Sequence, residues 1–220
     1  MIFRDRTDAG QRLAQHLRSY SDRPDTIVLG LPRGGVPVAA EVAEALNLPL
    51  DVLVVRKLGV PGSEEMAMGA IASGNVRYLN RPLIERLKIS ALDIEGVTIE
   101  EQQELNRREK AYRNGRPPLD VQNCSVILVD DGLATGATMR AAVEALKQRH
   151  PKQIVVAVPV AAAEICERLR QQVNAVVCAE TPDPFRAVGI WYEQFPQTTD
   201  DEVRTLLRRA IGRALNIYSA

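Results

Sequence analysis

Short runs of apolar residues alternate along the chain with segments in which apolar side chains recur at helical spacing. Runs that lack a regular polar alternation are typical of strands buried on both faces of a parallel sheet. We predict such strands at residues 26–29, 50–55, 126–129, 154–158 and 175–178. Helices are predicted at residues 3–20, 34–46 and 161–171, at the C-terminus through Leu215, and where Met139, Ala142, Val143 and Leu146 recur at helical spacing. Strands that alternate with helices in this way predict βαβ units and an α/β fold.

Two of these helices carry candidate capping residues. Asp8 is a candidate cap for the first helix, and Thr198 or Thr199 for the last. The first helix should pack against the edge of the sheet through one apolar face, which consists of Leu13, Ala14 and Leu17.

A different pattern occupies the middle of the chain. Residues 69–72 and 76–79 flank the turn Ser73-Gly74-Asn75 and predict a β-hairpin. Two helices should follow, at residues 81–88 and 94–113, and the second is rich in Glu, Gln and Arg, so we expect it to be largely solvated. We interpret residues 59–119 as an insertion or small lobe whose fold the sequence leaves open. The core would comprise residues 22–58 and 120–180, with a hood and C-terminal helix at 181–220, all within one domain of residues 1–220.

Length and composition narrow the class of protein. A chain of 220 residues suits one α/β domain with a substantial core. Lys plus Arg and Asp plus Glu each total 28, so no overall basic field argues for nucleic acid. No signal peptide is visible in residues 1–10, and no apolar run approaches the roughly 20 residues of a membrane span. We therefore expect a cytoplasmic protein that binds neither membranes nor nucleic acid.

The cysteines give no sign of a metal or redox motif. Cys124, Cys166 and Cys178 lie in apolar or helical context without the spacing of a zinc or redox site. We expect them to be buried reduced thiols.

Two adjacent acids, Asp130 and Asp131, follow the strand at residues 126–129. Ligands of open parallel sheets bind outside the carboxyl ends of the strands. The next residues form a small, glycine-rich turn before a helix, and glycines, hydroxyls and the free amides of a helix start can together hold a phosphate. This candidate phosphate cup consists of Gly132, Leu133, Ala134, Thr135, Gly136, Ala137 and Thr138. The arrangement suits a sugar phosphate, although an ordinary strand, polar turn and capped helix would use similar residues.

A second glycine-rich turn, Gly30-Leu31-Pro32-Arg33-Gly34-Gly35, joins the first strand to its helix. The strand at residues 50–55 ends in Arg56 and Lys57, and residues 58–68 form a predicted loop that contains Glu64 and Glu65. Three cations and two acids would then meet at one rim of the sheet, which suits magnesium pyrophosphate. A tight turn and a solvated strand end are the alternatives.

These stretches resemble a known family. VILVDDGLATGATM, at residues 126–139, closely resembles the ribose-phosphate loop of the type I phosphoribosyltransferases, and residues 30–62 resemble the matching section of adenine phosphoribosyltransferases. The resemblance implies a parallel sheet flanked by helices, with an inserted small lobe and a C-terminal hood. It also implies transfer of a 5-phosphoribosyl group from phosphoribosyl pyrophosphate to a nitrogenous base, with release of pyrophosphate. The whole chain is most similar to stand-alone members whose acceptor is not established.

The resemblance assigns roles residue by residue. Asp130 and Asp131 would hold the ribose 2- and 3-hydroxyls, and Mg²⁺ indirectly through those hydroxyls or water. Residues 132–138 would hold the 5-phosphate, and residues 58–68 would form a mobile lid. The catalytic set would be Asp130, Asp131, Arg33 and Lys57. The pyrophosphate contacts would be Arg33, Gly34, Gly35 and Lys57. In this family, the loop that corresponds to residues 30–35 often contains a strained peptide. Arg56 would join the substrate-binding residues.

The acceptor is the least determined part. Asp183-Pro184-Phe185 resembles the oxopurine segment in which an aromatic ring stacks on the purine, so Phe185 is a candidate, although core packing is the commoner role of aromatics. Ala134 stands where oxopurine enzymes carry a third acid, as it does in adenine enzymes. Adenine enzymes carry a lysine and a glutamate in the neighbourhood where this chain has Val60 and residues 73–75. With those two residues missing, Glu64 and Glu65 are the candidate proton acceptors.

Two further alternatives remain open. A non-catalytic sensor of phosphoribosyl pyrophosphate or of a nucleotide, which regulates a partner, is the rival to an enzyme. The helix at residues 94–113 covers the lid or forms a subunit contact, and the latter is compatible with a homodimer.

Overall fold

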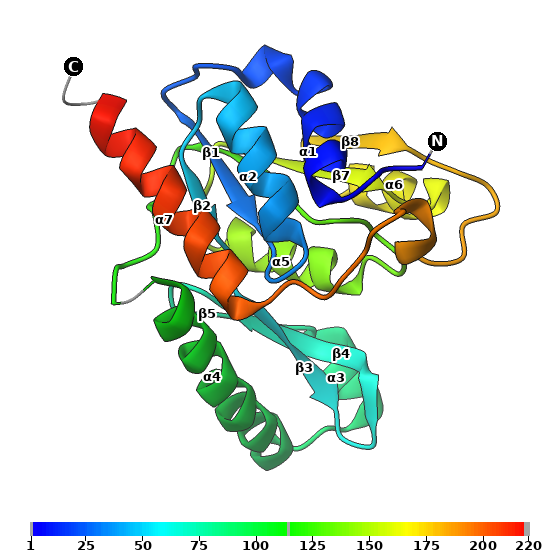
Figure 1. Cartoon of the computed structure of the whole chain (residues 1–220). Helices are drawn as coiled ribbons and strands as arrows, with labels where there is room; N and C mark the ends of the chain where they lie inside the picture. The colour runs from blue at the N-terminus through cyan, green and yellow to red at the C-terminus, as the bar shows by residue number, and fades with distance from the viewer. Residues whose placement is uncertain (1, 114, 218–220) are drawn as a thin grey trace.

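A five-stranded parallel sheet forms the centre of the computed structural model, which describes residues 2–113 and 115–217 (Figure 1). The strand order is β2-β1-β6-β7-β8, and every neighbouring pair is parallel. The strands are β1 (Thr26–Gly30), β2 (Leu50–Val52), β6 (Ser125–Val129), β7 (Gln153–Val160) and β8 (Ala175–Glu180). The predicted α/β fold with a parallel sheet flanked by helices is confirmed.

The strand order reverses between β1 and β6. The chain runs from β1 to β2 in one direction and from β6 through β7 to β8 in the other. Gly30 at the end of β1 is in register with Val129 at the end of β6. The loops that follow these two strands therefore start side by side, at the kind of switch point where open α/β sheets bind ligands.

Helices cover both faces of this sheet (Figure 1). One face packs against α1 (Arg6–Gln15), α2 (Gly35–Leu46) and α7 (Asp200–Ile217), and the other against α5 (Ala137–Lys147) and α6 (Ala163–Arg170). In β6, Ile127 and Val129 face the first group, whereas Val126 and Leu128 face the second. Burial on both faces explains why the strands read as continuous apolar runs.

The helix caps confirm one prediction and correct another. Asp5, rather than Asp8, caps α1, because its Oδ1 accepts from the Asp8 amide at 2.8 Å. α1 packs against α2, β7 and the edge strand β8, as predicted for a helix at the sheet edge. At α7, the Thr199 Oγ1 accepts from the Glu202 amide at 3.2 Å and the Glu202 carboxylate accepts from the Thr199 amide at 2.6 Å. This capping box confirms Thr199 as the cap.

The middle of the chain forms a small lobe with its own antiparallel sheet. Its elements are β3 (Val55–Val60), β4 (Ser63–Ala72), β5 (Val76–Leu79), α3 (Arg81–Leu87) and α4 (Ala91–Arg113). The predicted hairpin is confirmed, since Ala72 pairs with Val76. The prediction of one strand over residues 50–55 is wrong, because β2 ends at Val52 and β3 begins a different sheet at Val55.

Residues 58–68 are also not the predicted loop. They form most of the β3–β4 hairpin, which turns at residues 61–62, where Gly62 has a φ of 76°. Leu58, Val60 and Met68 are buried on this hairpin, so alternate positions pack inward as in a half-buried strand. The hairpin extends away from the parallel sheet, alongside α4 (Figure 1).

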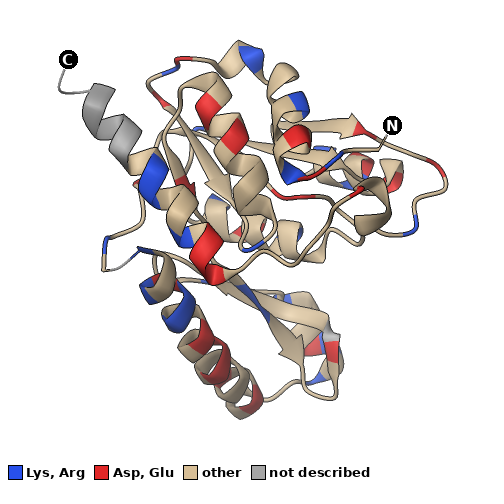
Figure 2. Ribbon diagram, in the orientation of Figure 1, with Lys and Arg blue, Asp and Glu red and all other residues tan. Residues whose placement is uncertain are grey.

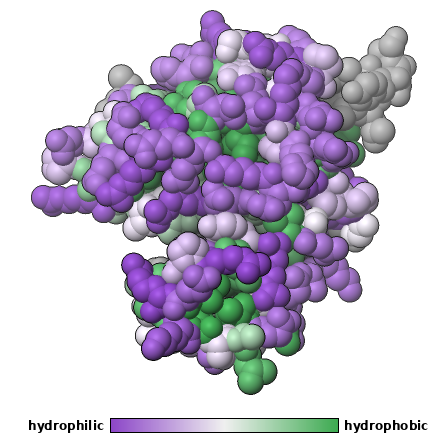
Figure 3. All heavy atoms as spheres, turned by 180° about the vertical axis from the view of Figure 1, so that it is seen from behind, coloured by the Kyte–Doolittle hydropathy of each residue, from purple (hydrophilic) through white to green (hydrophobic). Residues whose placement is uncertain are grey.

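α4 is largely solvated, as predicted. Its exposed side carries both signs of charge (Figure 2), and its side chains buried against the lobe and core are Ile94, Thr98, Leu105, Tyr112 and Arg113. Seen from behind, a group of apolar side chains is visible on the small lobe, framed by hydrophilic residues (Figure 3).

A buried arginine anchors the end of α4 to the core sheet. Arg113 donates to the Asp51 carboxylate at 3.2 Å and to the Val52 carbonyl at 2.5 Å, both in β2, and to Glu109 at 2.8 Å. Because this guanidinium is almost fully buried, its two acceptors in β2 fix the end of α4 relative to that strand.

The cysteines differ from the prediction. Cys166 of α6 and Cys178 of β8 are joined as a disulfide, because α6 packs on β8 and brings them together, whereas Cys124 is free. The prediction of reduced thiols is wrong for this pair. No helix in the described ranges combines the length and apolar character needed to cross a membrane.

Candidate active site

The two glycine-rich loops predicted to hold a ligand meet at the switch point. The Leu31 amide donates to the Val129 carbonyl at 2.9 Å, which links the first loop to the end of β6. A Cβ atom at Gly34 would lie 2.0 Å from Oδ2 of Asp131, and one at Gly35 would lie 2.7 Å from the Val129 carbonyl oxygen. Only glycine permits this approach, so the first loop and the two acids form one site. The Pro32–Arg33 peptide within this loop is cis.

Asp130 and Asp131 lie in an environment that opposes their ionisation. Burial raises the pKa of both carboxyl groups above the ordinary value of 3.8, and the charge of Asp131 raises the pKa of Asp130 further. The Asp131 amide donates to Oδ1 of Asp130 at 2.9 Å. Two carboxylates held this close favour a ligand that brings hydroxyl donors or positive charge.

Arg6 supplies a positive charge to this pair and was not foreseen. Its Nε donates to Oδ2 of Asp131 at 2.9 Å and its Nη2 lies 2.8 Å from the same oxygen, which works against the rise in the pKa of Asp131. Arg6 also donates to the Pro196 carbonyl at 2.7 Å and lies 3.9 Å above the Phe195 ring. It therefore joins the N-terminal helix, the acids and the hood.

The phosphate cup is narrower than predicted. Gly136, with a φ of 66°, precedes α5, and Ala134, Thr135 and Thr138 are exposed around it. The Leu133 amide instead donates to the Val160 carbonyl at 2.9 Å, and its side chain is buried. The Leu133 amide is therefore not available to a phosphate, and the cup is reduced to residues 134–138. Gly132 lies against the hood, because a Cβ there would meet Val188 at 2.5 Å.

The predicted meeting of three cations at one rim is wrong. Arg56 and Lys57 lie within β3 of the small lobe, and Arg56 pairs with Glu101 of α4 at 2.5 Å. Strand alternation places Lys57 on the opposite face, shared with Val55, which packs against the core cluster that contains Met139 of α5. Arg56 and Lys57 therefore point to opposite faces of β3.

Arg33 lines a cavity of about 490 Å³ together with Gly34 of its own loop and Asp131. The lining residues are Arg6, Arg33, Gly34, Asp131, Val188, Phe195, Pro196, Gln197 and Thr198. Phe185 does not line it and packs instead beside Phe3 and Tyr192, as the core-packing alternative predicts. The aromatic ring at the cavity is Phe195, which is 36% exposed.

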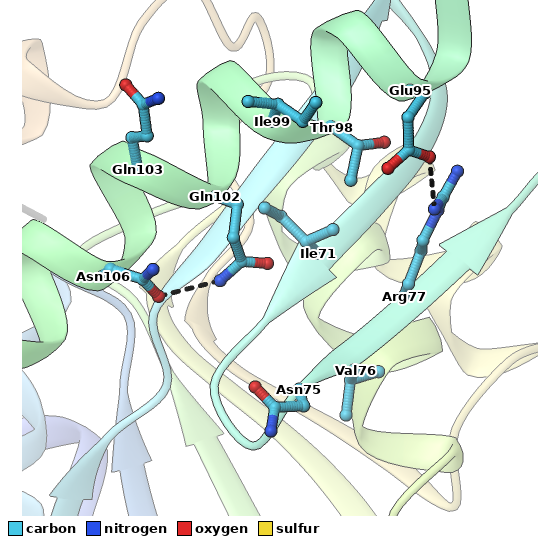
Figure 4. Close-up of a pocket in the computed structure, with 10 residues that line it drawn as sticks. All are labelled: Ile71, Asn75, Val76, Arg77, Glu95, Thr98, Ile99, Gln102, Gln103 and Asn106. Carbon is cyan, nitrogen blue, oxygen red and sulfur yellow. Dashed lines mark hydrogen bonds and ion pairs between the residues drawn. The ribbon is translucent and has the colours of Figure 1, made fainter. Parts of the chain in front are cut away.

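Glu64 is exposed on the β3–β4 hairpin, away from this cavity, and the Glu65 side chain lies outside the described residues. A second cavity, of about 440 Å³, lies between α4 and the strands β4 and β5 (Figure 4). The ion pair between Arg77 and Glu95, at 3.1 Å, stands at one end of it. It contains none of the residues predicted to bind substrate.

A parallel sheet with two acids and two glycine-rich loops at its switch point is the arrangement in which open α/β proteins bind their ligands. The family model described as phosphoribosyl transferase domain matches residues 4–193, and the chain belongs to this family.

Relatives of known name or structure agree with this assignment. A Mycobacterium tuberculosis protein named "Putative phosphoribosyl transferase" is 46% identical over 209 residues, which cover 95% of this chain and 47% of that protein. The chain thus spans about half the length of the curated relatives that it matches. A crystal structure from Thermus thermophilus is 41% identical, with a TM-score of 0.86, and the match covers 95% of this chain and 99% of that one.

Proposed function

We propose that the chain transfers the 5-phosphoribosyl group of phosphoribosyl pyrophosphate to a nitrogenous base, with release of pyrophosphate. The observation that carries the proposal is the contact between the Arg33-Gly34-Gly35 loop and the Asp130–Asp131 pair. Phosphoribosyl pyrophosphate carries a ribose diol between a 5-phosphate and a pyrophosphate. A site for this donor needs acids for the diol, placed between one loop for the phosphate and another for the pyrophosphate. Family membership supports the transferase class.

The acids have a positioning and an electrostatic role in this proposal. Asp130 and Asp131 accept hydrogen bonds from the ribose hydroxyls and stand near the positive charge that develops on the ribose carbon. The amides and hydroxyls of residues 134–138 hold the 5-phosphate at a distance from the reacting bond. Binding energy at that end fixes the geometry at the other.

The departing pyrophosphate requires positive charge. Arg33 lines the cavity beside Asp131 and is the first source of this charge, and Lys57 on β3 of the small lobe is the second. Charge placed before the reaction stabilises the leaving group as the bond breaks. Arg56 belongs to this set only if its pair with Glu101 opens.

Magnesium fits this site as a partner of the donor. Mg²⁺ usually binds through one or two carboxylates, with water and substrate phosphates as its other ligands. Within residues 2–113 and 115–217, no group of three or more His, Cys, Asp or Glu side chains could hold a metal by itself. Asp130 and Asp131 would hold Mg²⁺ through water or the ribose hydroxyls, and the ion would supply positive charge to the pyrophosphate.

Release of pyrophosphate with a panel of bases tests the proposal. The chain is incubated with phosphoribosyl pyrophosphate, Mg²⁺ and, separately, each purine, pyrimidine and biosynthetic precursor. We expect one class of base to release pyrophosphate well above the hydrolysis seen without a base. A variant with Asp130→Asn and Asp131→Asn should stay at that background.

The same experiment separates the enzyme from its rival. Tight binding of phosphoribosyl pyrophosphate without turnover for any base would favour a sensor that regulates a partner. Failure to bind phosphoribosyl pyrophosphate at all would contradict both functions.

A further inference from the structure

The start of α7 lies beside the end of α4, next to the glycine-rich loop that carries Arg33 (Figures 1 and 2). Asp200, the first residue of α7, receives contacts from the loop and from α4. Its Oδ1 lies 3.8 Å from Nη1 of Arg33, and its Oδ2 lies 3.6 Å from Nη1 of Arg107. One carboxylate therefore joins three elements that are far apart in the sequence.

Tyr112 fixes the position of this carboxylate. The tyrosine is almost fully buried in the core, and its hydroxyl donates to Oδ1 of Asp200 at 2.8 Å. The hydrogen bond and the nearby guanidinium groups hold the pKa of Asp200 below its usual value, while burial and Asp200 raise the pKa of Tyr112 to about 12. Near neutral pH, a charged Asp200 thus faces a protonated Tyr112.

The contact leaves Arg33 able to bind an anion. A guanidinium has five N–H donors, and Nη1 of Arg33 lies 3.8 Å from Asp200, a distance typical of a loose ion pair. The Arg33 side chain is 37% exposed and lines the cavity beside Asp131. Asp200 restricts the side chain from outside the cavity while the remaining donors can face a ligand.

We infer that Asp200 is a positioning residue that orients Arg33 for pyrophosphate, and that Tyr112 of the small lobe holds Asp200 in place. This inference rests on the proposed function, because it assigns Arg33 to the pyrophosphate half of the site. The small lobe then contributes to donor binding without a residue of α4 touching the ligand. A preoriented arginine loses less conformational freedom on binding, which raises affinity.

Calorimetric titration with magnesium pyrophosphate tests the inference in the full chain. We expect Asp200→Asn to weaken binding about fivefold, near the upper limit for a partly exposed ion pair, and Tyr112→Phe to weaken it by a smaller factor. The matched control is Asp201→Asn, because Asp201 is the next residue, is 83% exposed and pairs with Arg204 on its own helix. This control should bind as the unchanged chain does.

A double-mutant cycle distinguishes positioning from general loss of structure. In an Arg33→Ala background, Asp200→Asn should have no further effect on pyrophosphate affinity, because its only route to the ligand has been removed. An equal loss in both backgrounds would overturn the inference. Unchanged binding of pyrophosphate by Asp200→Asn alone would also overturn the inference. Tighter binding would overturn it too, because Asp200 would then compete with the ligand for Arg33. Absence of binding by the unchanged chain would instead count against the proposed function.

Discussion

Replacement of both Asp130 and Asp131 by asparagine is expected to weaken the binding of magnesium phosphoribosyl pyrophosphate by at least about 100-fold. Each carboxylate would lose a charge-assisted hydrogen bond to a ribose hydroxyl, and such bonds contribute roughly 1.5–3 kcal/mol each. The attraction for Mg²⁺ would be lost as well. Titration calorimetry at neutral pH measures the change.

The fold should survive this substitution. Asp130→Asn is the milder change, because burial raises the pKa of this carboxyl group and a neutral carboxamide suits that environment. Asp131→Asn removes the ion partner of Arg6 and should lower the free energy of unfolding about as much as Arg6→Ala does. Thermal unfolding of the variant serves as the check, and the exposed Asp201→Asn variant serves as the control for binding. A folded double variant with unchanged affinity would show that the acids do not hold the donor.

Arg6→Ala is expected to cost about 3 kcal/mol of the free energy of unfolding and to abolish donor binding. Arg6 is 11% exposed and Asp131 is 15% exposed, and their ion pair is 2.8 Å long. Loss of one partner of a largely buried pair leaves the other charge uncompensated, which typically costs 3–5 kcal/mol. Urea unfolding measures the stability, and calorimetry measures the binding.

Arg4→Ala is the matched control for this variant. Arg4 lies two residues earlier, its side chain is 70% exposed, and its ion pair with Asp8 is 3.6 Å long. Exposed pairs of this kind contribute about 0–1 kcal/mol. If Arg6→Ala were no more destabilising than Arg4→Ala, the account of Arg6 as the counterion of the acids would be wrong.

Much of the site was predictable because its residues follow one another in the sequence. Asp130, Asp131 and the turn through Thr138 lie between a buried strand and a helix, so local pattern was enough to place them. The meeting of this loop with Gly34 followed from a general property of parallel sheets, whose strands end at a common edge.

The misplacement of Arg56 and Lys57 has a local cause. Leu53 and Val54 are buried apolar residues between β2 and β3, so the apolar pattern continues through the point where the chain leaves one sheet for another. The choice between the two sheets depends on tertiary packing, which a single-sequence pattern does not contain.

Arg6, Phe195 and Asp200 were missed for a different reason. Arg6 pairs with an acid 125 residues away, and Asp200 contacts Tyr112 88 residues away. Neither carries a local motif, because an arginine at a helix start and an acid in a first helical turn are ordinary surface features. Their roles depend on long-range contacts that the N-terminal helix and the C-terminal part of the chain make with the rest of the fold.

A divided site should hold both ends of one donor, and a comparison of three ligands tests this most directly. Phosphoribosyl pyrophosphate, ribose 5-phosphate and pyrophosphate are each titrated into the unchanged chain with Mg²⁺. Two linked groups that bind together typically gain about 10²–10⁴ in affinity over either alone. We predict that the intact donor binds at least about 100-fold more tightly than each half. Equal affinity for the donor and one of its halves would contradict the divided site.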